Sequence, residues 1–266
     1  TFLTNRKNFL HPLNNDDLYL ENATCLRMSE LGYMSEAQDN LNIAYNTLDE
    51  YISDLKNALT KKYGPYEKIG LKKDGKHIQI NDSIIQIENE YYSSIRPKRV
   101  VESGQRPINV LKNKGIEYVE VRCLDNNPFL RESIDKNTAY FIEAYLMVSL
   151  IDEDYPFDEI RIKEIQENWH NAVRNGRDPK LLIKRDGKTI SVKDAASEVF
   201  SKVYDFANSL PIEAFDLKNK ILRSLEVQKS KLRDPDLTPS GNILKEMKEK
   251  NITWNEFCAD IAEKNT

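Results

Sequence analysis

Ten consecutive residues, Ile116–Asp125, constrain the fold of this chain more than any other stretch. Their composition predicts a buried β-strand, along which side chains point alternately to two faces. One face places Glu120 and Arg122 side by side among apolar and aromatic neighbours, whereas the other face is apolar in its middle. Burying a carboxylate and a guanidinium costs on the order of several kcal/mol unless they are paired or hold a ligand. The strand is therefore the first place to look for chemistry.

The spacing of this charge pair allows two interpretations. Glu120 and Arg122 could pair with each other, or with the next strand, at a solvated sheet edge, where ion pairs are energetically cheap. Alternatively, both charges could serve a ligand that binds on this face of the sheet. The alternation of side chains by itself leaves both interpretations open.

Composition narrows the class of protein. The chain has 266 residues, of which 39% are hydrophobic and 31% charged, so it is long enough for a real core and typical of a globular protein. Its formal net charge of -4 gives no sign of a nucleic-acid partner. No apolar run approaches the roughly 18 residues that a membrane span needs, so we expect no membrane partner.

The cysteines and the short motifs exclude several kinds of site. Cys25, Cys123 and Cys258 are few, odd in number and far apart, which favours a reducing compartment, and we expect a cytoplasmic protein. Neither a metal-binding spacing of Cys and His nor a glycine-rich nucleotide motif occurs. A nucleotide would therefore need another architecture. The chain begins at Thr1 without a clear element, so we expect a piece of a longer polypeptide.

The first half of the chain carries one clear helix signal and several strand signals. A helix is predicted over 47–62, where Thr47 and Glu50 form a capping box. Asp-Gly turns predict one hairpin over 69–80 and another over 181–192. The second half is predicted to be mainly helical, with helices over 135–151, 158–174, 193–209, 217–231 and 242–264.

This order predicts an α+β fold with two parts. Residues 1–132 would form a sheet-bearing part that includes the helix over 47–62. Residues 133–266 would form a mostly helical region with the hairpin near 181–192.

Two polar segments have alternative interpretations. Residues 83–92 predict a third strand whose polar face is either solvated or lines an active cavity. Residues 95–99 predict a basic turn that is either a solvated loop or a phosphate contact. Residue spacing does not decide between these alternatives.

Four ordered motifs carry a resemblance to a known family. They are Leu26–Tyr33, Gln86–Glu90 with Tyr92, Ile95–Arg99, and Ile116–Arg122 with Asn127–Phe129. Weaker echoes follow at Asn168-Trp169, Gly176–Pro179 and Pro235–Thr238. Together they resemble the C-terminal half of proteobacterial glutamate–cysteine ligases, over nearly the whole chain.

The resemblance implies an activity and a fold. Members of the family join glutamate to cysteine with ATP, through γ-glutamyl phosphate, and release ADP and phosphate in the first step of glutathione biosynthesis. The implied fold is part of a glutamine-synthetase-like curved antiparallel sheet, followed by the mostly helical C-terminal region. The implied substrates are glutamate, cysteine and ATP, with Mg²⁺ bridging phosphates to carboxylates on the strands.

The resemblance also implies roles for particular residues. Glu120 would bind Mg²⁺, which prefers oxygen ligands, and Arg122 would contact the transferred phosphoryl group as the catalytic residue. Arg27, Tyr33 and Tyr92 would form the cysteine subsite, with Arg27 holding the cysteine carboxylate.

Three more residues, Asn89, Arg96 and Lys98, are candidate nucleotide or phosphate contacts. The family's remaining metal ligands lie in an N-terminal half that this chain lacks, and one carboxylate cannot build a metal cluster. We therefore expect the missing half as a partner and an inactive chain without it. Two alternatives remain, a non-catalytic binding module and a related carboxylate–amine ligase that uses another amine.

Overall fold

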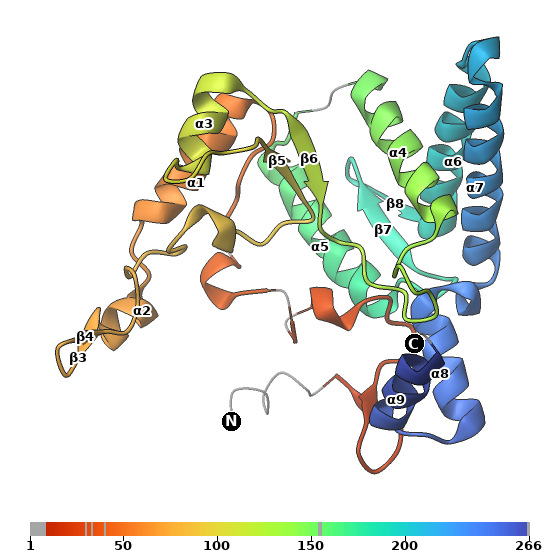
Figure 1. Cartoon of the computed structure of the whole chain (residues 1–266), viewed down its shortest axis with the longest axis horizontal. Helices are drawn as coiled ribbons and strands as arrows, with labels where there is room; N and C mark the ends of the chain where they lie inside the picture. Colours follow the sequence, from red (N-terminus) through yellow and green to blue (C-terminus); the bar gives the residue numbers. More distant parts are fainter. Residues whose placement is uncertain (1–8, 30, 33, 40, 154–155, 265–266) are drawn as a thin grey trace. The chain divides into compact units, whose positions relative to one another are not determined.

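The computed structural model describes residues 9–29, 31–32, 34–39, 41–153 and 156–264, which form a mixture of helices and short antiparallel strands (Figure 1). The strands in this described part pair only two by two. The α+β class is therefore confirmed in its coarse form. None of the described helices has the length and apolar character that a membrane span requires.

The chain divides into two compact units. Unit 1 comprises the described parts of residues 1–29, 125–155 and 163–266, and unit 2 those of residues 30–124 and 156–162. This division differs from the one that the sequence predicts after residue 132, because the first 29 residues group with the helical part.

In unit 2, helix α1 (Leu48–Thr60) and helix α3 (Pro107–Lys114) pack around a common core. The hydroxyl of Thr47 accepts a hydrogen bond from Glu50 N at 3.1 Å, so the predicted cap of the first helix is confirmed. The core consists of Ile43, Tyr51, Ile52, Leu55, Ala58, Ile85, Tyr91, Ile108 and Leu111.

A short helix and a small hairpin follow α1. Helix α2 (Gly64–Ile69), which the sequence did not predict, precedes strands β3 (Lys72–Lys73) and β4 (Lys76–His77). The hairpin predicted over 69–80 is confirmed in position, but each strand has only two residues, all of them exposed.

The strand predicted over 83–92 is wrong. After an isolated bridge at Ser83, the segment forms a loop and the 3-10 helix η3 (Glu88–Glu90). Polar side chains take up backbone groups that a strand would have paired: the side chain of Asn81 donates to Gln86 O at 3.0 Å, and that of Glu90 accepts from Gln86 N. Ile85 anchors the loop in the core with no exposed surface.

Strands β5 (Ile95–Lys98) and β6 (Tyr118–Val121) form an antiparallel pair in unit 2. The basic turn predicted over 95–99 is therefore wrong, because these residues are extended and paired with β6. The strand predicted over 116–125 is confirmed at its centre and shorter than expected. Its burial was also predicted wrongly: Tyr118 and Val119 are each 45% exposed, since a two-stranded sheet provides few covering neighbours.

Unit 1 is built on three helices, α4 (Lys136–Ile151), α6 (Val192–Ser209) and α7 (Phe215–Arg233), which lie side by side (Figure 1). Their shared core consists of Ala144, Val148, Phe200, Val203, Ala207, Ile221 and Leu225. Helix α5 (Glu159–Asn175) matches the helix predicted over 158–174.

The single helix predicted over 242–264 is wrong. Two helices, α8 (Pro239–Lys250) and α9 (Trp254–Lys264), occupy this region. Asn251 ends the first with a left-handed backbone at φ +51°, a conformation that Asn tolerates better than most residues. Thr253 then caps the second, because its hydroxyl accepts from Glu256 N at 3.3 Å.

The remaining elements of unit 1 are short. Strands β7 (Leu182–Arg185) and β8 (Lys188–Ser191) confirm the second predicted hairpin. Strands β1 (His11–Pro12) and β2 (Leu18–Tyr19) form a further pair. The other 3-10 helices of the described residues are η1 (Leu26–Met28), η2 (Glu36–Gln38) of unit 2, η4 (Ile212–Ala214) and η5 (Pro235–Leu237).

Residues of the three weaker sequence matches, Asn168-Trp169, Gly176–Pro179 and Pro235–Thr238, make tertiary contacts in unit 1. Arg177 is 7% exposed; its guanidinium donates to the carbonyl oxygens of Glu21 and Ala23 and to Asp236 Oδ1 at 3.2 Å. Trp169 Nε1 donates to Met28 O at 3.3 Å. Trp169 and Arg177 therefore have a structural role, because their hydrogen bonds connect the segment around η1 to α5 and η5.

Candidate functional site

The register of β5 and β6 places the candidate charges in one group. Arg96 lies opposite Glu120 and Lys98 opposite Tyr118. Arg122 Nη1 lies 3.1 Å from Glu120 Oε1, and Lys98 Nζ lies 3.8 Å from Glu120 Oε2. Glu120 therefore pairs both along its own strand and with the neighbouring strand, as the structural interpretation predicts.

One oxygen of Glu120 distinguishes this group from an ordinary ion pair. Oε2 is inaccessible to solvent and has no hydrogen-bond donor within reach among the described residues, although the side chain as a whole is 36% exposed. The Lys98 ammonium at 3.8 Å is beyond hydrogen-bond length. Because an unsatisfied buried acceptor is costly, this oxygen is suited to a ligand that supplies the missing interaction.

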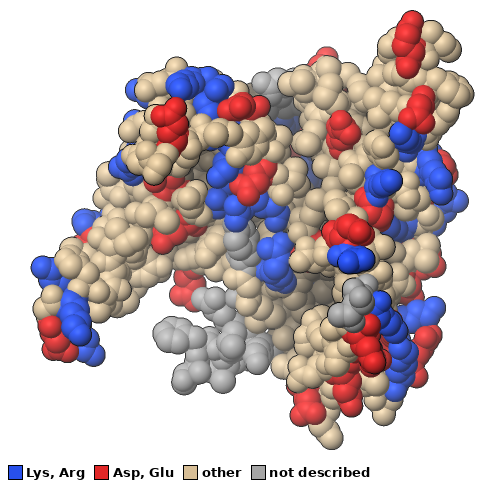
Figure 2. Space-filling view, viewed as in Figure 1, with Lys and Arg blue, Asp and Glu red and all other residues tan. Residues whose placement is uncertain are grey.

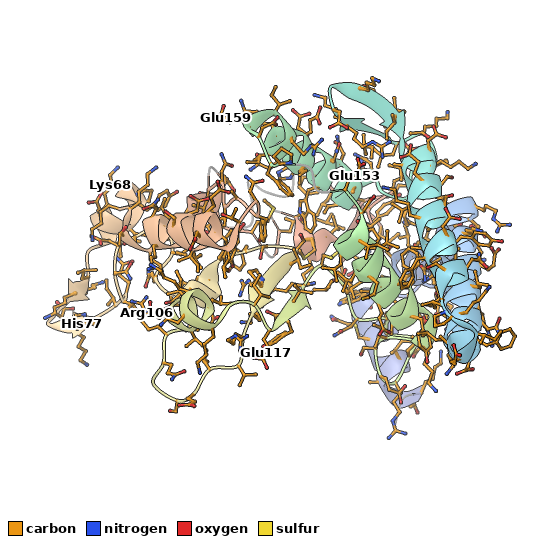
Figure 3. The ribbon with its side chains drawn as sticks, turned by 90° about the horizontal axis from the view of Figure 1, so that it is seen from above. Lys68, His77, Arg106, Glu117, Glu153 and Glu159 are labelled. Carbon is orange, nitrogen blue, oxygen red and sulfur yellow. The ribbon has the colours of Figure 1, made fainter. Side chains whose placement is uncertain are left out.

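Charges around this sheet otherwise pair locally. Figure 2 shows acidic and basic side chains interspersed over the visible face. Glu117, labelled in Figure 3 just before β6, lies 3.6 Å from Arg99 Nη1 and accepts from Val100 N at 3.2 Å. Arg106 is labelled at the start of α3, and its Nη2 lies 2.8 Å from Glu88 Oε1. The carboxylate of Glu88 therefore joins η3 to the start of α3.

Arg96 has a buried, structural environment. Its side chain belongs to a residue only 4% exposed, and its guanidinium donates to the carbonyl oxygens of Tyr91 and Asn89, the latter at 3.2 Å, and to Ser93 Oγ at 3.4 Å. Asn89 lies in η3 and contributes its carbonyl to this contact. The structure thus brings Asn89 and Arg96 together through the backbone of the loop.

Tyr92 stands at the end of the same loop. It is 38% exposed, and its backbone N donates to Gln38 Oε1 at 2.9 Å. Gln38 in turn donates to Glu90 O at 2.8 Å, so one amide side chain fixes the backbone on both sides of Tyr91. The sequence offered no signal for Gln38, which lies more than 50 residues away. Tyr33, the other predicted tyrosine, lies outside the described residues.

A cluster of buried tyrosines underlies this loop. Burial raises the pKa of Tyr45, Tyr51 and Tyr91, because the phenolate loses its hydration. Tyr45 donates from its hydroxyl to Ile95 O at 3.0 Å, which ties the cluster to β5. The three phenols therefore stay neutral and pack in the core, and Tyr45 also donates a hydrogen bond.

Arg27 belongs to unit 1. It lies in η1, and its side chain is 46% exposed. Arg27 Nε donates to Asp125 Oδ1 at 2.8 Å, and this hydrogen bond raises the pKa of the guanidinium. Sequence reasoning missed Asp125, although a carboxylate that ends a charged strand was a usable signal.

A complete metal site is not formed by the part of the chain that the structure describes. No group of three or more His, Cys, Asp or Glu side chains among these residues is placed to hold a metal ion. Glu120 Oε2 fits one position in a shell of oxygen ligands, which is the kind of shell that Mg²⁺ prefers.

Comparison with known proteins identifies the class to which this arrangement belongs. A family model described as Glutamate-cysteine ligase matches residues 1–172. The chain belongs to the glutamate-cysteine ligase family, which confirms the resemblance seen in the sequence motifs.

Curated relatives agree with this assignment. The chain is 42% identical over 256 residues to the glutamate–cysteine ligases of Pseudomonas entomophila and Pseudomonas paraeruginosa, and 40% identical to that of a Janthinobacterium strain. Each alignment covers 96% of this chain and 48% of the relative. The chain thus spans about half the length of the curated relatives it matches.

Solved structures extend the likeness to three dimensions. The glutamate–cysteine ligase of Francisella tularensis in complex with AMP matches with a TM-score of 0.88 and 38% identity, over 97% of this chain and 50% of that one. A bifunctional glutathione synthetase from Pasteurella multocida, at 16% identity and a TM-score of 0.60 over 91% of this chain and 26% of that one, shares the fold alone.

Proposed function

We propose that this chain carries part of the active site of an ATP-dependent glutamate–cysteine ligase. The reaction would form γ-glutamylcysteine through γ-glutamyl phosphate and release ADP and phosphate. One observation carries the proposal within this family: β6 holds Glu120, with an unsatisfied buried oxygen, directly beside the guanidinium of Arg122. The resemblance assigns these same two residues to the metal and the phosphoryl group.

Glu120 and Arg122 suit those roles chemically. Mg²⁺, when bound, would neutralise phosphate charge, and Glu120 Oε2 would be one of the oxygens that hold it. Arg122 would contact the transferred phosphoryl group, because a planar guanidinium matches its oxygens and stabilises developing charge. The 3.1 Å contact between the two side chains would keep that guanidinium oriented.

The basic residues of β5 would serve the nucleotide. The AMP complex of the Francisella relative supports ATP as the nucleotide. Lys98, 27% exposed at its side chain and near Glu120, would contact a phosphate directly. Arg96 and Asn89 would act through the loop they stabilise, because the Arg96 guanidinium already donates to Asn89 and Tyr91 carbonyl oxygens.

The resemblance assigns Arg27, Tyr33 and Tyr92 to the cysteine subsite. A guanidinium suits the cysteine carboxylate, and phenol rings suit the walls of a small pocket. Arg27 and Tyr92 both present exposed side chains, as this role requires. Free thiols at the described cysteines support a reducing, cytoplasmic setting for the enzyme.

The partner of this chain would be the half of the enzyme that it does not match. In the described residues β5 and β6 form only a two-stranded sheet, so their outer edges are available to further strands. We propose that these strands extend the pair into the curved, glutamine-synthetase-like antiparallel sheet. The relatives' length, about twice that of this chain, supports such a partner.

A coupled assay of ADP release tests the proposal. We expect no turnover from the 266 residues alone with glutamate, cysteine, ATP and Mg²⁺, and turnover once the complementary half is supplied in trans. Turnover by the chain alone would overturn the need for a partner. Association of the halves without turnover would favour a binding module. Turnover with another amine in preference to cysteine would favour a related ligase.

A further inference from the structure

Asp125 contacts a proposed substrate-binding residue, yet no motif gives it a role. We propose that Asp125 is a positioning residue that orients the guanidinium of Arg27 toward the carboxylate of the amine substrate. The inference rests on the proposed function, because it takes Arg27 as the group that binds this carboxylate. The contact itself is a hydrogen bond from Arg27 Nε to Asp125 Oδ1 at 2.8 Å.

The backbone of Arg27 is held in place without Asp125. Thr24, just before η1, donates from its N to Val173 O at 3.0 Å and from its hydroxyl to Ala172 O at 2.8 Å. At the end of η1, Met28 is 3% exposed and its carbonyl accepts from Trp169 Nε1. Helix α5 therefore fixes the main chain on both sides of Arg27.

Packing does not fix the side chain of Arg27 in the same way, because 46% of it is exposed. A long arginine side chain has many rotamers, and a guanidinium donates through five N–H groups in a rigid, planar fork. A bond at Nε fixes the direction of that plane. Asp125 is thus placed to limit the orientations of the Arg27 guanidinium, which lowers the ordering cost when an anion binds.

Asp125 is itself held by the segment that follows it. Asn127 N donates to Ser133 O at 2.8 Å, and Phe129 N donates to Asn127 Oδ1 at 3.1 Å. The ring of Phe129 packs edge-on against Phe257, whose side chain has no exposed surface, with 5.8 Å between ring centroids. The backbone that carries the Asp125 carboxylate is therefore held in place by the turn that follows it.

Asp125 also affects a second side chain near η1. Cys25 lies at the start of η1, and the carboxylate of Asp125 disfavours ionisation of its thiol. Burial, together with the negative charge of Asp125, raises the pKa of Cys25 to about 12. The thiol consequently stays protonated and reports on the presence of the carboxylate.

The simpler alternative is an exposed ion pair without further consequence, since such pairs contribute little to stability. The two interpretations differ in what they predict for substrate binding. A positioning role affects binding of the amine substrate selectively, whereas a surface pair affects no kinetic constant.

Steady-state kinetics of Asp125→Asn, measured with the complementary half of the enzyme supplied, test the proposal. We expect KM for cysteine to rise about tenfold while kcat changes less than about twofold. KM for glutamate and ATP and the melting temperature should stay as in the wild type. Asp125→Glu, which keeps the charge, should recover part of the loss. Asp216→Asn removes an exposed carboxylate paired with Lys220 and serves as the matched control.

Arg27→Gln separates failure of this inference from failure of the proposed function. If Arg27→Gln leaves KM for cysteine unchanged, the proposed cysteine subsite is wrong. If Arg27→Gln raises it and Asp125→Asn does not, only the positioning role is overturned. Where both raise it, the double variant should be no worse than Arg27→Gln, because Asp125 acts through Arg27.

Alkylation of Cys25 gives a readout that does not depend on activity. Removing the Asp125 charge lowers the pKa of the Cys25 thiol, so its thiolate fraction at pH 9 increases. In Asp125→Asn we expect the rate of Cys25 modification by iodoacetamide, followed by peptide mass spectrometry, to rise about twofold or more relative to exposed Cys258. An unchanged ratio would show that the Asp125 carboxylate does not lie beside η1, which would contradict the placement of Asp125 that the proposal requires.

Discussion

Two glutamates, Glu164 of α5 and Glu120 of β6, show how the surroundings of a carboxylate separate a structural role from a candidate functional one. Glu164 is 8% exposed, and its two oxygens accept from Asp186 N at 2.9 Å and Gly187 N at 2.8 Å. Glu120 has one oxygen beside Arg122 and a second, buried oxygen without a donor. The satisfied carboxylate holds a turn of the fold, whereas the unsatisfied one retains capacity for a ligand.

Replacing Glu120 by Gln should have the largest effect of the changes considered. In the complete enzyme we expect kcat to fall on the order of a hundredfold, because a neutral amide is a poor ligand for Mg²⁺. Stability should change by less than about 0.5 kcal/mol, since the side chain is part of a half-exposed sheet. Initial rates at saturating substrates and urea unfolding measure the two quantities. Wild-type kinetics would remove Glu120 from the site.

Glu164→Leu should show the opposite pattern. It leaves two backbone N–H groups of the β7–β8 turn without an acceptor, which should lower the free energy of unfolding by about 2 kcal/mol. Activity per folded molecule should be unchanged. Glu167→Leu, one turn further on α5 and 52% exposed at its side chain, is the matched control and should cost far less. Equal losses of unfolding free energy in the two variants would show that the Glu164 hydrogen bonds stabilise the fold no more than the exposed Glu167 side chain does.

Arg122→Lys tests the orientation that Glu120 gives to its neighbour. Lysine keeps the positive charge but loses the planar fork, so we expect kcat to fall about tenfold with KM for cysteine unchanged. The change in kcat should shrink in a Glu120→Gln background, because the two residues would act on the same phosphoryl group. Fully additive losses would argue that they act independently.

The smallest effects concern the two Asp-Gly hairpins. Gly75 and Gly187 have φ values of +75° and +73°, and a Cβ at either would meet no atom within 4 Å. Alanine should therefore cost each turn the same backbone strain, about 1 kcal/mol. Global unfolding should register this cost for Gly187→Ala and less of it for Gly75→Ala, whose exposed two-residue strands can open locally. Equal shifts in the urea midpoint would contradict this difference.

The hairpins also explain which parts of the fold were predictable. Both turns were predicted because Asp-Gly accepts the positive φ of a tight turn, and Asp74 and Asp186 have φ values of +49° and +53°. Strand length was not predictable. The β7–β8 hairpin has Asn168 and Glu164 of α5 beside it, and Asn168 bonds both N and O of Lys184.

In the candidate site, too, local features were predictable from the sequence and long-range contacts were not. Alternation on one strand brought Glu120 and Arg122 together correctly, and the motifs identified the family. The segment 83–92 was misassigned because its alternating pattern resembles a strand, while side chains from residues near and far satisfy its backbone instead. Gln38 and Asp125, which hold Tyr92 and Arg27, are distant in sequence from the residues they contact.

The sequence by itself determined most of the long helices, the Asp-Gly turns and the family, because these depend on local periodicity, turn conformation and ordered motifs. Tertiary structure decided how far each strand extends and which charges are satisfied. It also decided which carboxylate serves the fold and which remains open to a ligand. The physical reason is that a buried polar atom is satisfied by whichever groups the folded chain brings within hydrogen-bond reach. For Glu164 those groups lie 22 and 23 residues away, and for Glu120 Oε2 no donor is within reach in the described residues.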